Sequence, residues 1–307
     1  MKSKILDRFA VIDLGSNTFH LLIVEKTTWG FKELYRKRVY TKLAMGGSRT
    51  ILEESFSKGI ACLQEFRNIL NRFKIVNYRA LGTAALRSAD NGKEFISQAM
   101  DTANIKIDLI DGNQEATLIA KGVKAAIDIS SHRYLIMDIG GGSVEFIILE
   151  NGSVQWQQSF PIGLAILKAL FHTEEPISVS ELEQMKNFLD LELQPLKQQL
   201  TDGPKIKALI GASGSFEVVQ AILDLSRWNQ QTYKCHVLDF FKVQEMIMHK
   251  STEERVQIKG LPIERVDLIV VALFLINYIL KLTETEEIII SDYALKEGVI
   301  AQKFDIS

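Results

Sequence analysis

Cysteine is scarce in this chain, and its scarcity excludes two kinds of structure. Only Cys62 and Cys235 occur among 307 residues, far apart and without the spacing of metal ligands. Two such cysteines form neither a disulfide framework nor a structural zinc site. They indicate a reducing compartment, and the first residues turn acidic and glycine-containing too early for a secretory signal. We therefore expect a cytoplasmic protein.

An excess of charge of one sign is also missing. The 36 Lys and Arg residues are balanced by 38 Asp and Glu residues, which leaves a net charge of −2. No overall field then attracts nucleic acid or a membrane surface, so we expect neither as a partner. An anionic substrate would need a local basic site.

Long hydrophobic runs are absent too. The longest candidate, Leu268 to Ile276, is nine residues, whereas a membrane span needs about 20. Asp267 and Asn277 bracket this run. We predict a helix that is buried on all sides.

A pattern that occurs twice is the most informative feature present. Phe9 to Ser16 reads FAVIDLGS, and Leu135 to Ser143 reads LIMDIGGGS. In each copy an apolar run leads to Asp and a Gly/Ser turn, and two further strand-like runs follow. This order is typical of an antiparallel meander. Its repetition predicts two domains of related topology that face each other.

Helices and strands alternate through the rest of the chain. Apolar residues at steps of three and four predict a helix over 51–73, and Ser180 with Glu183 resembles a capping box that opens another. Both halves are therefore mixed α/β, with a hinge near 120–132. We predict domains over 1–125 and 126–307, the last helix (293–304) packing back on the first domain. Strand-like runs that lead into helices occur at 78–81, 105–110, 206–210 and 287–290.

The two Asp loops are candidate phosphate sites. Gly and Ser at a hairpin tip expose backbone N–H groups, and a preceding Asp13 or Asp138 could hold hydrated Mg²⁺ beside the phosphate. Alternation along the strand could turn Glu145 toward the same cleft, although an exposed carboxylate is the equal alternative. A single Asp loop is more often a capped turn, but the matched pair favours the phosphate interpretation.

Two further turns have phosphate-binding features. Gly211-Ala-Ser-Gly-Ser215 precedes a helix whose N-terminus offers free N–H groups, although small residues also serve strand-to-helix packing. Gly82-Thr83 precedes a helix that carries Arg87, which could bind phosphate bidentately or simply lie on the surface.

Glu115 lies where a strand gives way to a helix. It could be an ordinary acid in a first helical turn or a general base that orients water against phosphorus. The basic residues Arg36, Lys37, Arg38 and Lys42 form either a solvated strand face or a track for a polyanion. HExxH, GxxxxGK[ST] and GxSxG motifs are absent.

The chain resembles the exopolyphosphatase / guanosine-pentaphosphate phosphatase (Ppx/GppA) family of the actin-like ATPase superfamily over nearly its whole length. The DIGGGS loop is shared with actin-like folds in general, whereas the Asn-Gln-Glu-Ala helix start and TAALRSADN are particular to this family. The resemblance is carried by VIDLGSNTFHLLI from Val11, GTAALRSADN from Gly82, LIDGNQEATLIAKGV from Leu109, MDIGGGSVEF from Met137, GASGSFEVV from Gly211, GLPIERVDLI and ISDYALKEGVI.

The resemblance implies two actin-like (ribonuclease H-like) domains with an active-site cleft between them. It implies that Glu115 is the catalytic carboxylate and that Asp138 and Glu145 flank the metal and water, with Asp13 in the first phosphate loop. Residues expected to contact phosphate are Ser16, Asn17, Thr18, Arg87, Gly141, Gly142, Ser143, Ser213, Gly214 and Ser215.

Three departures from the family pattern affect what the resemblance implies. The segment 40–45 stands where the family usually has an Arg-Leu-Gly type sequence. Lys296 stands where the family usually has arginine, and a lysine lacks the forked guanidinium that binds bidentately. Many members also carry a long C-terminal helical domain, whereas this sequence ends at Ser307. Chain-length preference is therefore open.

We expect Mg²⁺-dependent hydrolysis of the terminal phosphate of polyphosphate. The alternatives are removal of the 5′ terminal phosphate of guanosine pentaphosphate, a kinase or ATPase-like switch, and a non-catalytic phosphate or nucleotide sensor. The partner is then polyphosphate or a phosphorylated guanosine nucleotide. The sequence does not decide the oligomeric state, and a homodimer stays open.

Overall fold

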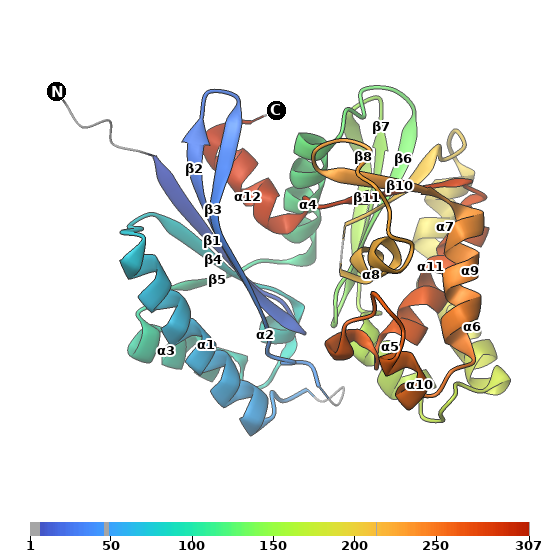
Figure 1. Ribbon diagram of the computed structural model, residues 1–307, viewed down its shortest axis with the longest axis horizontal. Helices are drawn as coiled ribbons and strands as arrows, with labels where there is room; N and C mark the ends of the chain where they lie inside the picture. Colours follow the sequence, from blue (N-terminus) through green and yellow to red (C-terminus); the bar gives the residue numbers. More distant parts are fainter. Residues whose placement is uncertain (1–6, 46–48, 213, 307) are drawn as a thin grey trace. The chain divides into compact units, whose positions relative to one another are not determined.

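The chain divides into two units, seen in a computed structural model that describes residues 7–45, 49–212 and 214–306 (Figure 1). Unit 1 comprises Met1–Ala125 together with Leu295–Ser307, and unit 2 comprises Ala126–Ala294. Each unit is built on one mixed sheet, which confirms the α/β class predicted from the sequence.

Unit 1 has a five-stranded sheet in the order β3-β2-β1-β4-β5. The first three strands form an antiparallel meander, and β4 and β5 continue parallel to β1. The strands are β1 (Arg8–Leu14), β2 (Thr18–Thr27), β3 (Gly30–Tyr40), β4 (Tyr78–Gly82) and β5 (Ile107–Leu109). The helices are α1 (Glu53–Arg72), α2 (Ala84–Ser88), α3 (Gly92–Ala103), α4 (Gly112–Ala126) and α12 (Leu295–Phe304).

Alternation along β1 divides its side chains between the two faces of this sheet. Ile12 and Leu14 belong to a core shared with Phe66 of α1 and Phe95 of α3. Val11 and Asp13 therefore point to the other face, where α12 packs on β1 (Figure 1). Asp13, a predicted site residue, thus lies on the face covered by the last helix.

Unit 2 has a six-stranded sheet in the order β10-β11-β9-β6-β7-β8. Its strands are β6 (Arg133–Ile139), β7 (Val144–Glu150), β8 (Ser153–Phe160), β9 (Ala208–Gly211), β10 (Thr232–His236) and β11 (Glu287–Ser291). The helices are α5 (Leu164–Phe171), α6 (Val179–Glu192), α7 (Gln194–Thr201), α8 (Gly214–Ile222), α9 (Val237–Met248), α10 (Thr252–Val256), α11 (Ile269–Thr283) and the short 3₁₀ helix η1 (Ile263–Arg265).

The two sheets repeat one topology. β6, β7 and β8 form an antiparallel meander, and β9 and β11 extend it in parallel, as β4 and β5 do in unit 1. The repeated meander predicted from the Asp-Gly pattern is therefore confirmed. Unit 2 differs by β10, which pairs antiparallel to β11 at the edge.

Two helix predictions have different outcomes. The run around Leu268 lies in α11, most of whose residues are buried in the core of unit 2. None of the helices in the described residues has the length and apolar character that crossing a membrane requires. The capping box was predicted two residues too late, because Ser178 and Glu181, rather than Ser180 and Glu183, exchange the hydrogen bonds that begin α6.

Candidate active site

The two Asp loops make the same tight turn. The Gly15 N–H donates to the carbonyl oxygen of Thr18 at 3.1 Å, and the Gly140 N–H donates to that of Ser143 at 2.9 Å. A Cβ atom would lie 3.0 Å from the acceptor at Gly15 and 2.8 Å at Gly140. Glycine is required at Gly140 and strongly favoured at Gly15 because the chain returns so closely on itself.

The second loop directs three N–H groups away from the protein segment that supports it. The carbonyl oxygens of Gly140, Gly141 and Gly142 accept bonds at 3.0, 2.9 and 3.4 Å from the N–H groups of residues 163–165, where α5 begins. In a planar trans peptide the C=O and the next N–H point in opposite directions. The N–H groups of Gly141, Gly142 and Ser143 therefore point away from α5, an arrangement that suits an anion.

The first loop has a similar arrangement. The carbonyl oxygens of Ser16 and Asn17 accept bonds from the N–H groups of Ala44 (2.9 Å) and Lys42 (3.0 Å). The N–H groups of Asn17 and Thr18 consequently point away from that supporting segment. The buried Nδ2 of Asn17 has no hydrogen-bond partner among the residues that the structure describes. The segment 40–45, which departs from the family pattern, thus supports this loop through its backbone.

Asp138 and Glu145 share one face of the sheet of unit 2. They are directly opposite on β6 and β7, and Ser159 is opposite Glu145 on β8. Oε1 of Glu145 accepts bonds from Oγ of Ser143 (2.7 Å) and Oγ of Ser159 (2.6 Å), and Glu145 is 2% exposed. Glu145 is thus buried and fixed in orientation, which contradicts the alternative of an exposed strand carboxylate.

The corresponding row in unit 1 has different chemistry. Asp13 is opposite His20 on β2, and His20 is opposite Arg38 on β3. Burial raises the pKa of Asp13 to about 6; the positive charge of Lys296 opposes this rise and the negative charge of Glu297 adds to it. Asp13 therefore lies level with a histidine and feels one cation and one anion of α12, whereas Asp138 lies opposite a second carboxylate.

A third loop lies beside the Asp138 loop. β9 runs parallel to β6, with Gly211 level with Met137, so both strands end at the same edge of the sheet. There α8 begins at Gly214, and Ser215 is buried. Ser213 lies outside the described residues. A Cβ atom at Gly214 would be 2.0 Å from Nη2 of Arg265, so that guanidinium lies against the loop.

Glu115 is in the first turn of α4, but other residues cap this helix. Oδ1 of Asp111 accepts the N–H of Gln114 at 2.8 Å, and Oε1 of Gln114 accepts the N–H of Asp111 at 3.0 Å. Glu115 is 8% exposed, and its Oε2 is 3.9 Å from Nη1 of Arg87. Capping therefore does not explain Glu115, and its catalytic role stays a prediction.

Arg87 lies on α2, one turn from its start, as predicted. Its Nη1 donates to the carbonyl oxygen of Ile110 at 2.6 Å, which holds the guanidinium beside Glu115. Its side chain remains about one-third exposed, so it is accessible to an anion. Its contact with phosphate stays a prediction.

The basic run Arg36-Lys37-Arg38 does not form one surface. Arg36 donates to Glu33 at 2.9 Å and to the buried Glu297 at 3.0 Å, while Lys37 pairs with Glu65 of α1. Alternation in β3 sends neighbouring side chains to opposite faces. Neither a continuous polyanion track nor a simple solvated face describes this run.

The carboxylates of unit 2 fit a hydrated magnesium ion. Mg²⁺ usually takes one or two carboxylates and keeps several waters. Asp138 and the oriented Glu145 provide two such groups on adjacent strands. Across the described residues, no three His, Cys, Asp or Glu side chains gather as a metal site. The part of Asp13 in metal binding, and the cleft predicted between the Asp loops, stay predictions.

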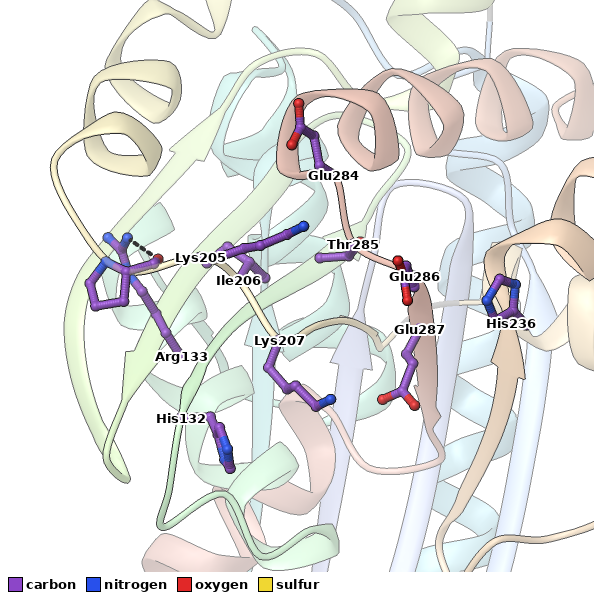
Figure 2. Close-up of a pocket in the computed structure, with 11 residues that line it drawn as sticks. His132, Arg133, Lys205, Ile206, Lys207, His236, Glu284, Thr285, Glu286 and Glu287 are labelled. Carbon is purple, nitrogen blue, oxygen red and sulfur yellow. Dashed lines mark hydrogen bonds between the residues drawn. The ribbon is translucent and has the colours of Figure 1, made fainter.

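Figure 2 shows a pocket of about 400 Å³ elsewhere in unit 2. Lys205 and Lys207, just before β9, lie across from Glu286 and Glu287 at the start of β11. This edge is where β6, β9 and β11 begin, the opposite end of the sheet from Asp138. The pocket contains none of the predicted site residues.

Sequence reasoning missed two residues beside the loops, Ser159 and Arg265. Ser159 had only the alternation of β8 as a signal, and Arg265 lies within GLPIERVDLI, which the family resemblance included without a role. Both become recognisable only through their contacts with Glu145 and Gly214.

Comparison with known proteins agrees with this fold and these motifs. The guanosine-5'-triphosphate,3'-diphosphate pyrophosphatase of Photobacterium profundum is 29% identical over 294 residues, which cover 95% of this chain and 58% of that protein. The chain spans about three-fifths of the length of such curated relatives. An exopolyphosphatase crystal structure from Cytophaga hutchinsonii has a TM-score of 0.92 and 36% identity, covering 97% of this chain and 98% of that one.

A more distant structure shares the fold. The Aquifex aeolicus PPX-GPPA enzyme has a TM-score of 0.79 at 22% identity, over 96% of this chain and 99% of that one. The model of the Ppx/GppA phosphatase family matches residues 22–306, nearly the whole sequence. The chain therefore belongs to the Ppx/GppA phosphatase family.

Proposed function

We propose that this protein hydrolyses phosphoanhydride bonds and removes the terminal phosphate of inorganic polyphosphate. The observation that carries the proposal is the shared geometry of the Asp loops. In both, carbonyl oxygens are held by a neighbouring segment, and the following N–H groups point the other way. Such N–H groups bind phosphoryl oxygens and stabilise the charge that develops on them.

Each group then has a defined part in the reaction. The N–H groups of Gly141, Gly142 and Ser143 bind phosphoryl oxygens, and Arg87 adds a positive charge. Glu115 accepts a proton from the attacking water, whose oxygen forms the new P–O bond as the bridging P–O bond breaks. Orthophosphate leaves, and the shortened chain keeps the bridging oxygen.

Magnesium is the proposed cofactor, held by Asp138 and Glu145 with Asp13 in the first loop. When bound, it neutralises charge on the phosphoryl oxygens. The serine hydroxyl groups on Oε1 of Glu145 fix the direction of that carboxylate. Outer partners of this kind commonly tune both metal affinity and activity.

Guanosine pentaphosphate is the second candidate substrate. It is favoured by the relative from Photobacterium profundum, which is named as a guanosine-5'-triphosphate,3'-diphosphate pyrophosphatase. The phosphate-binding groups above serve either substrate, because both present a terminal phosphoanhydride. Polyphosphate is the first candidate because this chain is 36% identical to the exopolyphosphatase of known structure and 29% identical to that relative.

One assay tests the proposal. Orthophosphate release is measured with Mg²⁺ from polyphosphate, guanosine pentaphosphate and ATP in parallel, with Glu115→Gln as the control for contaminating phosphatase. Polyphosphate should be the preferred substrate. Preference for guanosine pentaphosphate would select the second candidate, and release from ATP alone would contradict both.

A further inference from the structure

The first turn of α12 places a buried cation where an exposed one would be ordinary. Lys296 is only 9% exposed, and Glu297 beside it is fully buried. Lysine is almost never so buried unless it is paired, and the positive end of a helix dipole disfavours a cation in the first turn. A specific anionic neighbour is therefore needed to account for its position.

Three contacts fix α12 against unit 1. At its end, Phe304 packs edge-on against Phe9 at the start of β1, with 6.2 Å between ring centroids. In its first half, a Cβ atom on Gly298 would lie 1.7 Å from the carbonyl oxygen of Leu118, so the helix is in close contact with α4. At its start, Arg36 binds Glu297.

This arrangement brings Lys296 to the Asp13 end of β1. Because Phe304 meets the first residues of β1, the first turn of α12 lies toward the other end of that strand. The charges of Lys296 and Glu297 both act on the Asp13 carboxylate, with opposite signs. Arg36, on the same face of the sheet, is bound by Glu33 and Glu297, whereas the charge of Lys296 acts on Asp13.

We propose that Lys296 is a positioning residue of the first Asp loop, whose buried ammonium balances the charge of Asp13 and so favours its ionised form beside that loop. This inference rests on the proposed function, in which Asp13 is a site residue. It gives a role to the lysine at a position where the family usually has arginine. A compact ammonium balances one carboxylate without the forked geometry of a guanidinium.

A mutant cycle in activity tests the inference. Lys296→Met should lower kcat/KM for phosphate release by about tenfold or more, as loss of an outer partner commonly does. Lys296→Arg should restore most of the activity, because it returns the charge. In an Asp13→Asn background, Lys296→Met should change the rate by less than about twofold, since its partner is gone. Lys303→Met is the matched control, because it removes a cation at the other end of the same helix, where Nζ lies 5.7 Å from the centre of the Phe9 ring and away from Asp13.

The same cycle in thermal unfolding separates this inference from the proposed function. Lys296→Met should lower Tm in the wild type and lower it less than half as much in Asp13→Asn, whether or not the protein is a phosphatase. If Lys296→Met lowers Tm equally in both backgrounds, or lowers it no more than Lys303→Met does, Lys296 is not paired with Asp13. If coupling appears in Tm but no substrate is hydrolysed, the proposed function fails and the pairing stands.

Discussion

The two units share a turn but differ in the row of side chains beside it. In unit 1 the strands bring Asp13, His20 and Arg38 level with one another, and in unit 2 the equivalent row is Asp138, Glu145 and Ser159. The backbone geometry is thus repeated, whereas the charge is not. One row places a histidine and an arginine level with its aspartate, and the other gives it a second carboxylate.

This difference suggests a division of tasks between the units. A row with two carboxylates attracts a divalent cation, whereas a row with histidine and arginine attracts the phosphate oxygens themselves. In the proposed function, the repeated fold supplies two turns that bind anions, and the different residues across the strands give each turn a different partner. Four predictions can break or sharpen this comparison.

The largest effect is expected for Glu115, the base proposed in unit 1. Glu115→Gln should lower kcat by about 10²–10⁴-fold, the usual general-base contribution, and leave Tm nearly unchanged because Asp111 and Gln114 cap the helix. Steady-state rates and melting curves on one preparation measure both. Gln114→Ala is the control, and it should lower stability without affecting turnover. If the turnover of Glu115→Gln stays within about threefold of wild type, Glu115 is not the general base.

The next effect concerns Ser159, which orients Glu145 in unit 2. Ser159→Ala should raise the Mg²⁺ concentration for half-maximal activity by about 10–100-fold, as for other outer partners of metal ligands. Arg38→Ala removes the equivalent residue of unit 1 and should raise KM for polyphosphate with the Mg²⁺ requirement unchanged. Magnesium titrations of both variants make the test, and equal Mg²⁺ shifts in both would contradict the division of tasks.

Asp13 offers a comparison in stability rather than activity. Because its pKa rises from 3.8 to about 6 on folding, the folded protein holds this proton more tightly, and stability falls as pH rises from about 4 through about 6. Asparagine cannot ionise, so Asp13→Asn should gain up to about 3 kcal/mol above pH 6 and nothing below pH 4. Denaturant unfolding at several pH values measures the gain. The control is Asp101→Asn, on the exposed side of α3, whose effect on stability should not follow this pH trend. If the stability gained by Asp13→Asn does not change with pH, the raised pKa of Asp13 is wrong.

The smallest effect compares the turns directly. A methyl group at Gly140 would lie 2.8 Å from the carbonyl oxygen of Ser143, and one at Gly15 would lie 3.0 Å from that of Thr18. Gly140→Ala should therefore lower the free energy of unfolding by about 1–3 kcal/mol. Gly15→Ala should lower it less, because the carbonyl oxygen of Thr18 needs to move less to make room for the methyl group. Unfolding midpoints rank the two. The reverse ranking would show that the turns are not equivalent.

Local patterns were enough to predict the turns and the class of fold. Asp followed by a Gly/Ser turn indicates that the chain reverses directly after the strand. This signal lies in neighbouring residues, so the sequence alone shows it. The capping box shows how far this reasoning extends. Ser178-x-x-Glu181 and Ser180-x-x-Glu183 overlap in sequence, and in the structure the N–H and hydroxyl of Thr173 also donate to Glu181, a contact that the local pattern does not show.

The site residues that were missed depend on contacts between distant segments. Ser159 reaches Glu145 only in the register set between β7 and β8, where an irregularity follows Ile148. Arg265 meets Gly214 across some 50 residues of sequence. No periodicity encodes such contacts. The family resemblance supplied a role for Glu115, but the structure was needed to show that its helix is capped by others.

The return of α12 to unit 1 has a consequence for synthesis on the ribosome. Domains usually fold in order from the N-terminus as the chain emerges. Here unit 2 is one continuous segment, whereas unit 1 lacks its last helix until residues after Ala294 have been made. The unit that is begun first is therefore completed last, and until then the β1 face beneath α12 is uncovered. A nascent chain stalled when residues up to Ala294 have just left the ribosome should expose Phe9 and Val11 to chaperones while unit 2 is already complete.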